Sequence, residues 1–277
     1  MKTWDRVWPA PAKINLFLHV VGRRADGYHL LQTAFRFLDH GDELRFEPRH
    51  DGEVVAACPL SGVLPDADLT IRAARLLRQE CGLADGVTIR LTKRLPLGGG
   101  LGGGSSDAAT TLMALNRLWQ CGLSPAELQR LGLSLGADVP VFIHGRACFA
   151  EGVGERFTDL VLPPAWYLVT VPGVAVPTAD IFRAADLRRD TPGMRPADWR
   201  SGIGDNDLEP VARRLFPEVG RHLDWLRARG QARMSGSGAC CFAEFTTEGQ
   251  ARSAWAALPD GMTGFVARGL DSHPIPN

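Results

Sequence analysis

The chain has 277 residues, with 31 acidic and 31 basic side chains that leave it no net charge. Because no run of Lys or Arg exceeds two residues, the sequence offers no electrostatic footprint for nucleic acid or a membrane surface. The six cysteines lack Cys-x-x-Cys spacing, which argues against a zinc site and a disulfide framework. Neither a signal peptide nor a membrane-spanning apolar segment is found, so we expect a cytoplasmic protein, and the length predicts two domains.

The chain opens with a predicted strand and a predicted helix. Apolar residues alternate over residues 14–20, and this period predicts a strand that presents Lys13 and Asn15 on one face. Residues 66–81 have the apolar spacing of a helix, and residues 87–92 form a second strand. That second strand leads directly into the most informative segment of the sequence.

The segment from Leu95 to Ala109 reads Leu-Pro-Leu-Gly-Gly-Gly-Leu-Gly-Gly-Gly-Ser-Ser-Asp-Ala-Ala. Each ordered glycine costs roughly 0.5–1 kcal/mol relative to alanine, so six of them indicate close approach of the backbone to a ligand. An apolar-striped helix follows, and we expect Ser105, Ser106 or Asp107 to cap it. The free N–H groups of the loop and the helix dipole then converge on one anion, for which a phosphate chain is the best candidate. A flexible linker is the alternative, which the helix directly after the run disfavours.

Three other phosphate loops do not match this run. No Gly-Lys-Ser/Thr follows the glycines, so the sequence lacks a Walker loop. Glycines in the dinucleotide spacing are present, but the acid that should follow about 20 residues later is replaced by Leu118, Trp119 and Gln120. The Val-Ala-Ile-Lys, His-Arg-Asp and Asp-Phe-Gly motifs of protein kinases are absent as well.

A capping box places one aspartate just past a helix end. Ser124-Pro-Ala-Glu127 predicts the start of a helix, with proline at its first position. The helix is expected to stop at Gly136, which leaves Asp138 immediately beyond it. Val139 and Pro140 follow, and they restrict the backbone and so fix the direction of the carboxylate.

The second half of the chain restarts the pattern after about residue 163. The predicted order is strand 166–171, helical stretches 179–189 and 208–229, strands 231–234 and 239–245, helix 248–258 and strand 263–269. This is the split βαβ order of ferredoxin-like domains. Residues 191–201, which are rich in Pro, Arg and Gly, are expected to form a mobile surface loop.

Three segments together resemble the motifs of the GHMP small-molecule kinases. They are Pro-Ala-Lys-Ile-Asn-Leu-Phe-Leu at residues 11–18, the glycine-serine loop, and Arg-Met-Ser-Gly-Ser-Gly-Ala-Cys at residues 233–240. Asp-Gly-Tyr-His-Leu at 26–30, Gly-Ala-Asp-Val-Pro at 136–140 and Asn-Asp-Leu-Glu-Pro at 206–210 resemble one branch, the 4-diphosphocytidyl-2-C-methyl-D-erythritol kinases. The sequence departs from the family at position 68. The family usually has asparagine there, in the segment on the adenine side of the nucleotide, whereas this chain has Asp68.

The resemblance implies a two-domain α+β GHMP kinase fold and a bound nucleotide. Residues 1–162 would form an ATP-binding domain like domain 2 of ribosomal protein S5, and residues 163–277 a ferredoxin-like substrate domain. The implied cofactors are ATP and Mg²⁺; either loop serine is a candidate metal ligand, and no carboxylate ligand is assigned. The implied ATP-binding residues are Pro96, Leu97, Gly98, Gly99, Gly100, Leu101, Gly102, Gly103, Gly104, Ser105 and Ser106.

The resemblance also assigns the transfer chemistry to Lys13 and Asp138. Phosphoryl transfer needs mainly positioning and charge stabilisation, so a base and a cation suffice. Asp138 would accept the proton of the substrate hydroxyl, although the residue type alone also suits a loop-capping aspartate. Lys13 would keep Asp138 ionised and orient it, or favour ionisation of the hydroxyl; otherwise it is a solvated strand lysine.

The substrate end is assigned to aromatic and polar side chains. By resemblance, Tyr28 and His29 hold a cytosine base, with Phe182 as the second stacking ring, although turn and core packing would also explain these residues. Asn15 is expected to donate to the diphosphate or the sugar chain, and Thr178 is a weaker candidate.

The implied reaction is ATP-dependent phosphorylation of the 2-hydroxyl of 4-diphosphocytidyl-2-C-methyl-D-erythritol, a step of the non-mevalonate route to isoprenoid precursors. The alternatives are another small-alcohol kinase of the same superfamily and a non-catalytic binding member of the fold. The expected partner is the small-molecule substrate, without nucleic acid or membrane, and the expected state is a monomer or weak homodimer.

Overall fold

The structure is a computed structural model that describes residues 4–25 and 27–275, so Asp26 of the Asp-Gly-Tyr-His-Leu segment lies outside the described residues. The strands are β1 Trp8–Arg23, β2 His29–Arg49, β3 Val54–Ala56, β4 Gly86–Thr92, β5 Cys148–Gly152, β6 Arg156–Asp159, β7 Trp166–Val171, β8 Ala232–Met234, β9 Cys241–Phe245 and β10 Thr263–Leu270. The α-helices are α1 Leu69–Glu80, α2 Gly103–Leu118, α3 Pro125–Leu135, α4 Val139–His144, α5 Thr178–Arg183, α6 Glu209–Leu215, α7 Pro217–Arg227 and α8 Glu248–Ala256. Two 3₁₀ turns, Pro65–Ala67 and Pro196–Asp198, complete the elements.

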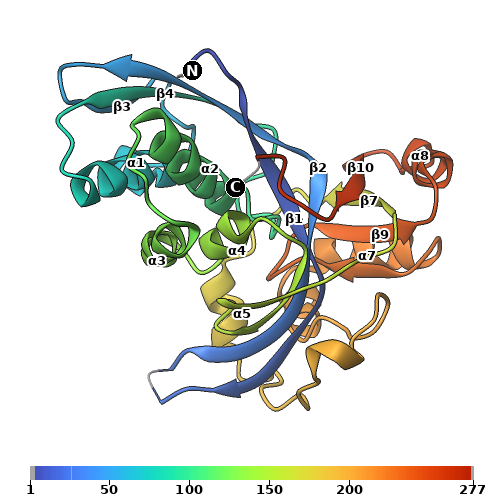
Figure 1. The fold of residues 1–277 in the computed structure, drawn as a ribbon. Coiled ribbons are helices and arrows are strands. Elements are labelled where there is room, and N and C mark those ends of the chain that lie inside the picture. The colour runs from blue at the N-terminus through green and yellow to red at the C-terminus, as the bar shows by residue number, and fades with distance from the viewer. Residues whose placement is uncertain (1–3, 26, 276–277) are drawn as a thin grey trace.

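A long antiparallel hairpin of β1 and β2 organises the molecule. It runs between the helices α1–α4 on one side and β7, β9, β10, α7 and α8 on the other (Figure 1). Strand β2 also pairs with β4, β5 and β10, which gives a ten-stranded sheet that continues through both halves. Residues on both faces of β1 are buried, so its period-2 pattern separates two packed faces instead of a core face from solvent.

The first half places its helices against this hairpin. Helix α2 contacts β1, β2, α1, α3 and α4, and it is therefore the central helix of the layer. Its buried residues Ala108, Leu112 and Leu115 confirm the predicted stripe. The predicted capping box at the start of α3 is present, with both reciprocal hydrogen bonds formed.

The second half has the predicted ferredoxin-like topology. Its strands lie in the order β10-β7-β9-β8, all antiparallel, with α7 and α8 packed against them. This arrangement confirms the α+β class. Because β10 also pairs with β2, the two halves share one sheet, and the division at residues 162 and 163 stays a prediction.

Three predicted elements differ from the structure. The helix predicted over 208–229 is two helices, because the chain leaves helical geometry at Phe216 and Pro217 starts α7. The helix predicted over 179–189 ends at Arg183. The segment predicted as a mobile surface loop buries Trp199, whose ring stacks on Phe17 at a centroid distance of 5.7 Å, so this part of the segment belongs to the core.

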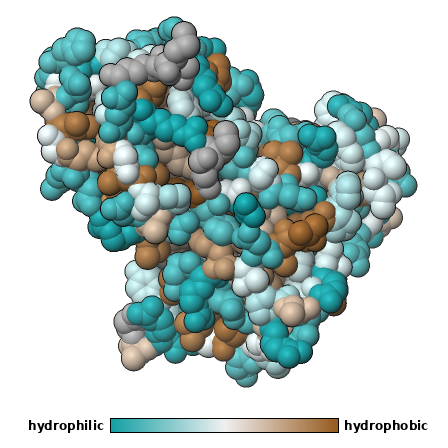
Figure 2. Space-filling view, viewed as in Figure 1, coloured by the Kyte–Doolittle hydropathy of each residue, from teal (hydrophilic) through white to brown (hydrophobic). Residues whose placement is uncertain are grey.

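Among the described residues, no helix is both long and apolar enough to cross a bilayer. On the face seen in Figure 2, hydrophobic residues are scattered among hydrophilic ones.

Candidate active site

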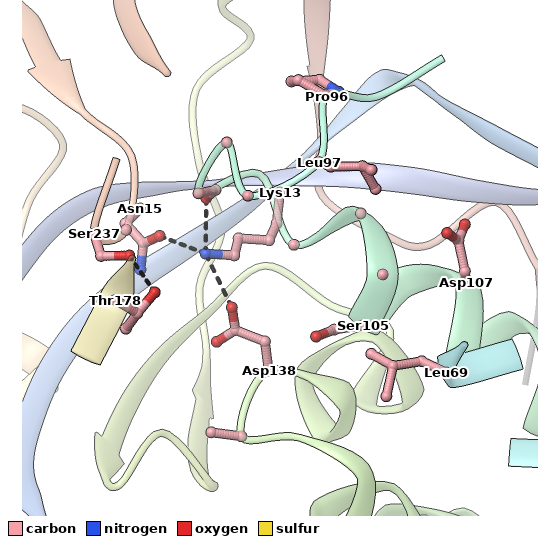
Figure 3. Close-up of a pocket in the computed structure, with 18 of the residues that line it drawn as sticks. Lys13, Asn15, Leu69, Pro96, Leu97, Ser105, Asp107, Asp138, Thr178 and Ser237 are labelled. Atoms are coloured by element: carbon pink, nitrogen blue, oxygen red, sulfur yellow. Dashed lines mark hydrogen bonds and ion pairs between the residues drawn. The ribbon is translucent and has the colours of Figure 1, made fainter. Parts of the chain in front are cut away.

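A cavity of about 520 Å³ opens where the glycine-rich loop, β1 and the third motif meet. Lys13, Asn15, Asp138, Thr178 and Phe182 line it, together with most of the glycine-rich loop. Figure 3 shows Lys13 at the centre, with Asp138 below it and Thr178 and Ser237 to one side. The cavity therefore brings together residues that lie up to 225 positions apart in the sequence, Lys13 and Gly238.

The glycine-rich loop ends in a helix that begins without a side-chain cap. Gly102 is the N-cap, its φ is +71°, and no side chain bonds to the first N–H groups. The prediction that Ser105, Ser106 or Asp107 caps α2 is therefore wrong. The glycines enter the helix themselves, so these three residues lie within its first turns. The first N–H groups of a helix have no internal partner, and an uncapped end leaves them free for an anion.

The carbonyl oxygens of the loop point into the protein. Gly99 accepts from the Cys240 N–H at 3.0 Å, and Leu101 accepts from the Lys13 N–H at 2.9 Å. Gly100 accepts from Lys13 Nζ at 3.1 Å and from the Ser235 hydroxyl at 2.8 Å. These bonds join all three motifs and hold the loop in place.

Two predicted nucleotide-binding residues do not line the cavity. The Leu101 side chain is buried in the apolar core cluster that also contains Ile14 and Leu95. Ser106 is fully buried, and its hydroxyl has no partner among the described residues. Ser105 does line the cavity, so it is the loop serine that remains a candidate metal ligand.

Lys13 is a buried cation that contacts the candidate base. Its ammonium group lies 2.7 Å from Asn15 Oδ1, 3.1 Å from Gly100 O and 3.3 Å from Asp138 Oδ2. The Lys13 side chain is only 2% exposed, whereas that of Asp138 is 39% exposed. The lysine is thus held rigidly. The Asp138 carboxylate reaches from the start of α4 into the cavity, where a ligand can approach it (Figure 3).

Asn15 is already bonded within the protein. Its Oδ1 accepts from Lys13, and its Nδ2 donates to the Thr33 hydroxyl at 2.9 Å. The expected role as a donor to the substrate is therefore limited to the second hydrogen of Nδ2. The contacts instead show Asn15 as a residue that orients Lys13, since the alternation of β1 places the two side chains on one face.

Lys93 and Asp107 line the same cavity and form a buried charge cluster with Asp42 that the sequence did not reveal. Lys93 Nζ lies 2.5 Å from Asp42 Oδ2 and 2.8 Å from Asp107 Oδ2, and Asp107 Oδ1 is buried without a hydrogen-bond partner in the described part of the chain. Burial raises the pKa of Asp107 to about 7, against the attraction of Lys93. No local spacing signals this cluster, because its members come from β2, the end of β4 and α2.

The departure from the family at Asp68 has a structural explanation. Asp68 is the N-cap of α1, and its Oδ1 accepts from the Thr70 N–H at 2.8 Å and the Thr70 hydroxyl at 2.7 Å. Aspartate and asparagine cap helices about equally well, so the substitution preserves the start of α1. Asp68 lines the cavity beside Leu69, and it therefore presents an acceptor there.

Of the five predicted substrate residues, Asn15, Thr178 and Phe182 line the cavity, whereas Tyr28 and His29 do not. Thr178, at the start of α5, bonds to the Ser237 hydroxyl at 2.7 Å. Phe182 lines the cavity, and its ring packs on His29 at a centroid distance of 4.9 Å and a tilt of 31°. Tyr28 is 66% exposed and does not line the cavity, so its predicted stacking role is not formed in this structure.

Comparison with known proteins agrees with this arrangement. The GHMP kinases N terminal domain matches residues 68–146, and the GHMP kinases C terminal domain matches residues 193–263. A 4-diphosphocytidyl-2-C-methyl-D-erythritol kinase from Dechloromonas aromatica (strain RCB) is 60% identical over 97% of this chain and 98% of that protein. The chain belongs to the GHMP kinases.

Other relatives of this kinase agree. A protein of the same name from Thiobacillus denitrificans (strain ATCC 25259 / T1) is 60% identical over 98% of both chains. The crystal structure of a 4-(cytidine 5'-diphospho)-2C-methyl-D-erythritol kinase matches with a TM-score of 0.82 and 38% identity, over 95% of this chain and 99% of that one. A mevalonate kinase structure, at a TM-score of 0.71 and 15% identity, shows the shared fold.

Proposed function

We propose that this kinase transfers the γ-phosphoryl group of ATP to the 2-hydroxyl of 4-diphosphocytidyl-2-C-methyl-D-erythritol. The observation that carries the proposal is the contact of buried Lys13 with Asp138, 3.3 Å apart, in a cavity that the uncapped start of α2 also reaches. Relatives that are 53–60% identical over nearly the whole chain carry the name of this activity. The step belongs to the non-mevalonate route to isoprenoid precursors.

The protein supplies positions for both ends of the reaction. Free N–H groups at the start of α2 fit a triphosphate, and the Ser105 hydroxyl on its first turn fits Mg²⁺. When bound, Mg²⁺ would neutralise charge on the phosphates. No group of three or more His, Cys, Asp or Glu residues in the described part of the chain is arranged to hold a metal by itself. The metal would therefore rely on substrate phosphates and water.

Asp138 accepts the proton of the acceptor hydroxyl as the oxygen attacks phosphorus. Its carboxylate is partly exposed to the cavity, while Lys13 holds it from the buried side. Asn15 and Gly100 O hold the lysine, so the ammonium group does not have to reorganise during transfer. The cytidine end of the acceptor lies toward His29 and Phe182, and α5 joins it to the transfer centre through Thr178.

The test is an ADP-release assay with a panel of acceptors. We expect the cytidyl acceptor to be phosphorylated much more efficiently than free methylerythritol, mevalonate or homoserine, because its base supplies binding energy that positions the distant hydroxyl. CMP should compete with the acceptor and only weakly with ATP. Preference for mevalonate or homoserine would indicate another kinase of the family, and no ADP release with any acceptor would indicate a binding protein.

A further inference from the structure

One arginine outside every motif connects Phe182, which lines the cavity, with His29, whose ring packs on Phe182. Arg189 follows α5, and its Nη2 donates to the carbonyl oxygens of Phe182 at 3.0 Å and Ala184 at 2.7 Å. Its Nη1 donates to Leu187 O at 2.9 Å. The third nitrogen, Nε, lies 3.2 Å from His29 Nε2 at the start of β2. The guanidinium thus closes the C-terminal end of α5 and reaches the imidazole from the same plane.

The chemistry of these groups sets the protonation of His29. A guanidinium group has donors only, so His29 Nε2 must accept and carries no proton. A neutral imidazole with an accepting Nε2 carries its proton on Nδ1. Burial, together with the charges of Arg189 and Arg23, lowers the pKa of His29, so the ring stays neutral near pH 7. Nδ1 makes no hydrogen bond to the residues described, so its N–H remains available.

We propose that Arg189 is a positioning residue, which holds His29 as the Nδ1–H tautomer so that this N–H donates to an acceptor atom on the edge of the cytosine base. The inference rests on the proposed function for the identity of the base. Cytosine offers a ring nitrogen and a carbonyl oxygen as acceptors on that edge, and an Nε2–H tautomer would present a lone pair to them instead. The same guanidinium also holds the backbone of Phe182. One side chain therefore positions both the Phe182 ring beside the base and the His29 N–H at the edge of the base.

The tautomer is tested in the protein without substrate. Two-bond ¹H–¹⁵N spectra of ¹⁵N-labelled protein, with His29→Gln used to assign the signals, should show Nδ1 protonated and Nε2 unprotonated at pH 7.5. In Arg189→Met the Nε2–H tautomer should gain population and the pKa of His29 should rise toward its ordinary value. Arg188→Met is the matched control, because Arg188 is the exposed neighbour and contacts Asp190 at 3.6 Å. An Nε2–H tautomer in the wild-type protein would overturn the inference and leave the proposed function intact.

Kinetics separate positioning from a purely structural role. Arg189→Met should raise KM for the cytidyl acceptor about tenfold at pH 7.5, as expected for one lost hydrogen bond of about 1.4 kcal/mol, and leave KM for ATP unchanged. Lowering the pH to 6 protonates the variant ring, which restores the Nδ1–H donor, so the defect should shrink. The wild type should show no such change, because its Nδ1–H is present throughout.

A second variant covers the case in which Arg189→Met does not fold. Arg189→Lys keeps the positive charge but lacks the planar fork, and it should show the same pH-dependent KM defect if geometry matters. A defect of equal size at pH 6 and 7.5 would mean that the arginine only supports α5, which would overturn the proposal. If the wild type does not phosphorylate the cytidyl acceptor at all, the proposed function fails while the spectra still report on Arg189 and His29.

Discussion

Gly100 packs directly against the turn at residues 235–238. Its φ is +75°, and a Cβ added there would lie 3.0 Å from Gly238 O and closer still to Ser235 O. Both obstacles are backbone atoms, which cannot rotate away. We therefore predict that Gly100→Ala forces the loop and the turn apart by about 1 Å, a displacement that can lower a rate about 10²-fold.

The displacement acts through Lys13, because Gly100 O accepts from both Lys13 Nζ and the Ser235 hydroxyl. Part of the stability loss comes from the left-handed backbone alone, which costs a non-glycine residue about 1–2 kcal/mol. Gly122→Ala is the matched control for that part. Its φ is +72°, nothing lies within 4 Å of an added Cβ, and it stands in the loop after α2, away from the cavity.

The assay measures kcat by ADP release and stability by thermal unfolding for both variants. We expect the backbone strain to destabilise both variants, but only Gly100→Ala to turn over more slowly. Gly100→Ala should also lose the hydrogen bond to Ser235, so its free energy of unfolding should fall by about a further 1 kcal/mol. If Gly100→Ala turns over as fast as Gly122→Ala, contact between the loop and the turn does not position Lys13, and the reasoning is refuted.

Four further variants test the site. Asp138→Asn should lower kcat about 10²–10⁴-fold and leave ATP affinity by calorimetry unchanged; near-normal turnover would remove it as the base. Lys13→Met should lower kcat and, because buried Asn15 Oδ1 loses its donor, cost about 1–3 kcal/mol in denaturant unfolding, whereas an unaltered rate would make the lysine structural. Phe182→Ala should weaken the binding of the cytidyl acceptor by about 1–3 kcal/mol and leave the binding of free methylerythritol unchanged. The pKa of Asp107 is raised to about 7, so the folded state binds its proton more tightly than the unfolded state does, and the free energy of unfolding falls as pH rises from about 4 to 7. The Asp107→Asn variant should therefore melt at a higher temperature than the wild type at pH 8 but not at pH 5.

The sequence indicated the chemistry of the site wherever the signal was local. The period of β1 placed Lys13 and Asn15 on one face, and the structure confirms their contact at 2.7 Å. Helix α3 begins at the capping box and ends at Gly136 as predicted, which leaves Asp138 at the start of the next helix. Strand and helix order in the second half indicated the ferredoxin-like topology. These features depend on neighbours within a few positions, so one sequence is enough to find them.

Only the tertiary structure decided which distant residues share the cavity. Asp42, Lys93 and Asp107 form a buried cluster because β2, β4 and α2 converge there, and Arg189 meets His29 across 160 positions. The uncapped start of α2 was equally hidden, because serine and aspartate are good caps and only the left-handed glycine before them shows that they lie inside the helix. Local propensity fixes which elements form and which residues share a face. Long-range packing decides which charges are buried together and which hydrogen-bond donors stay free for a ligand.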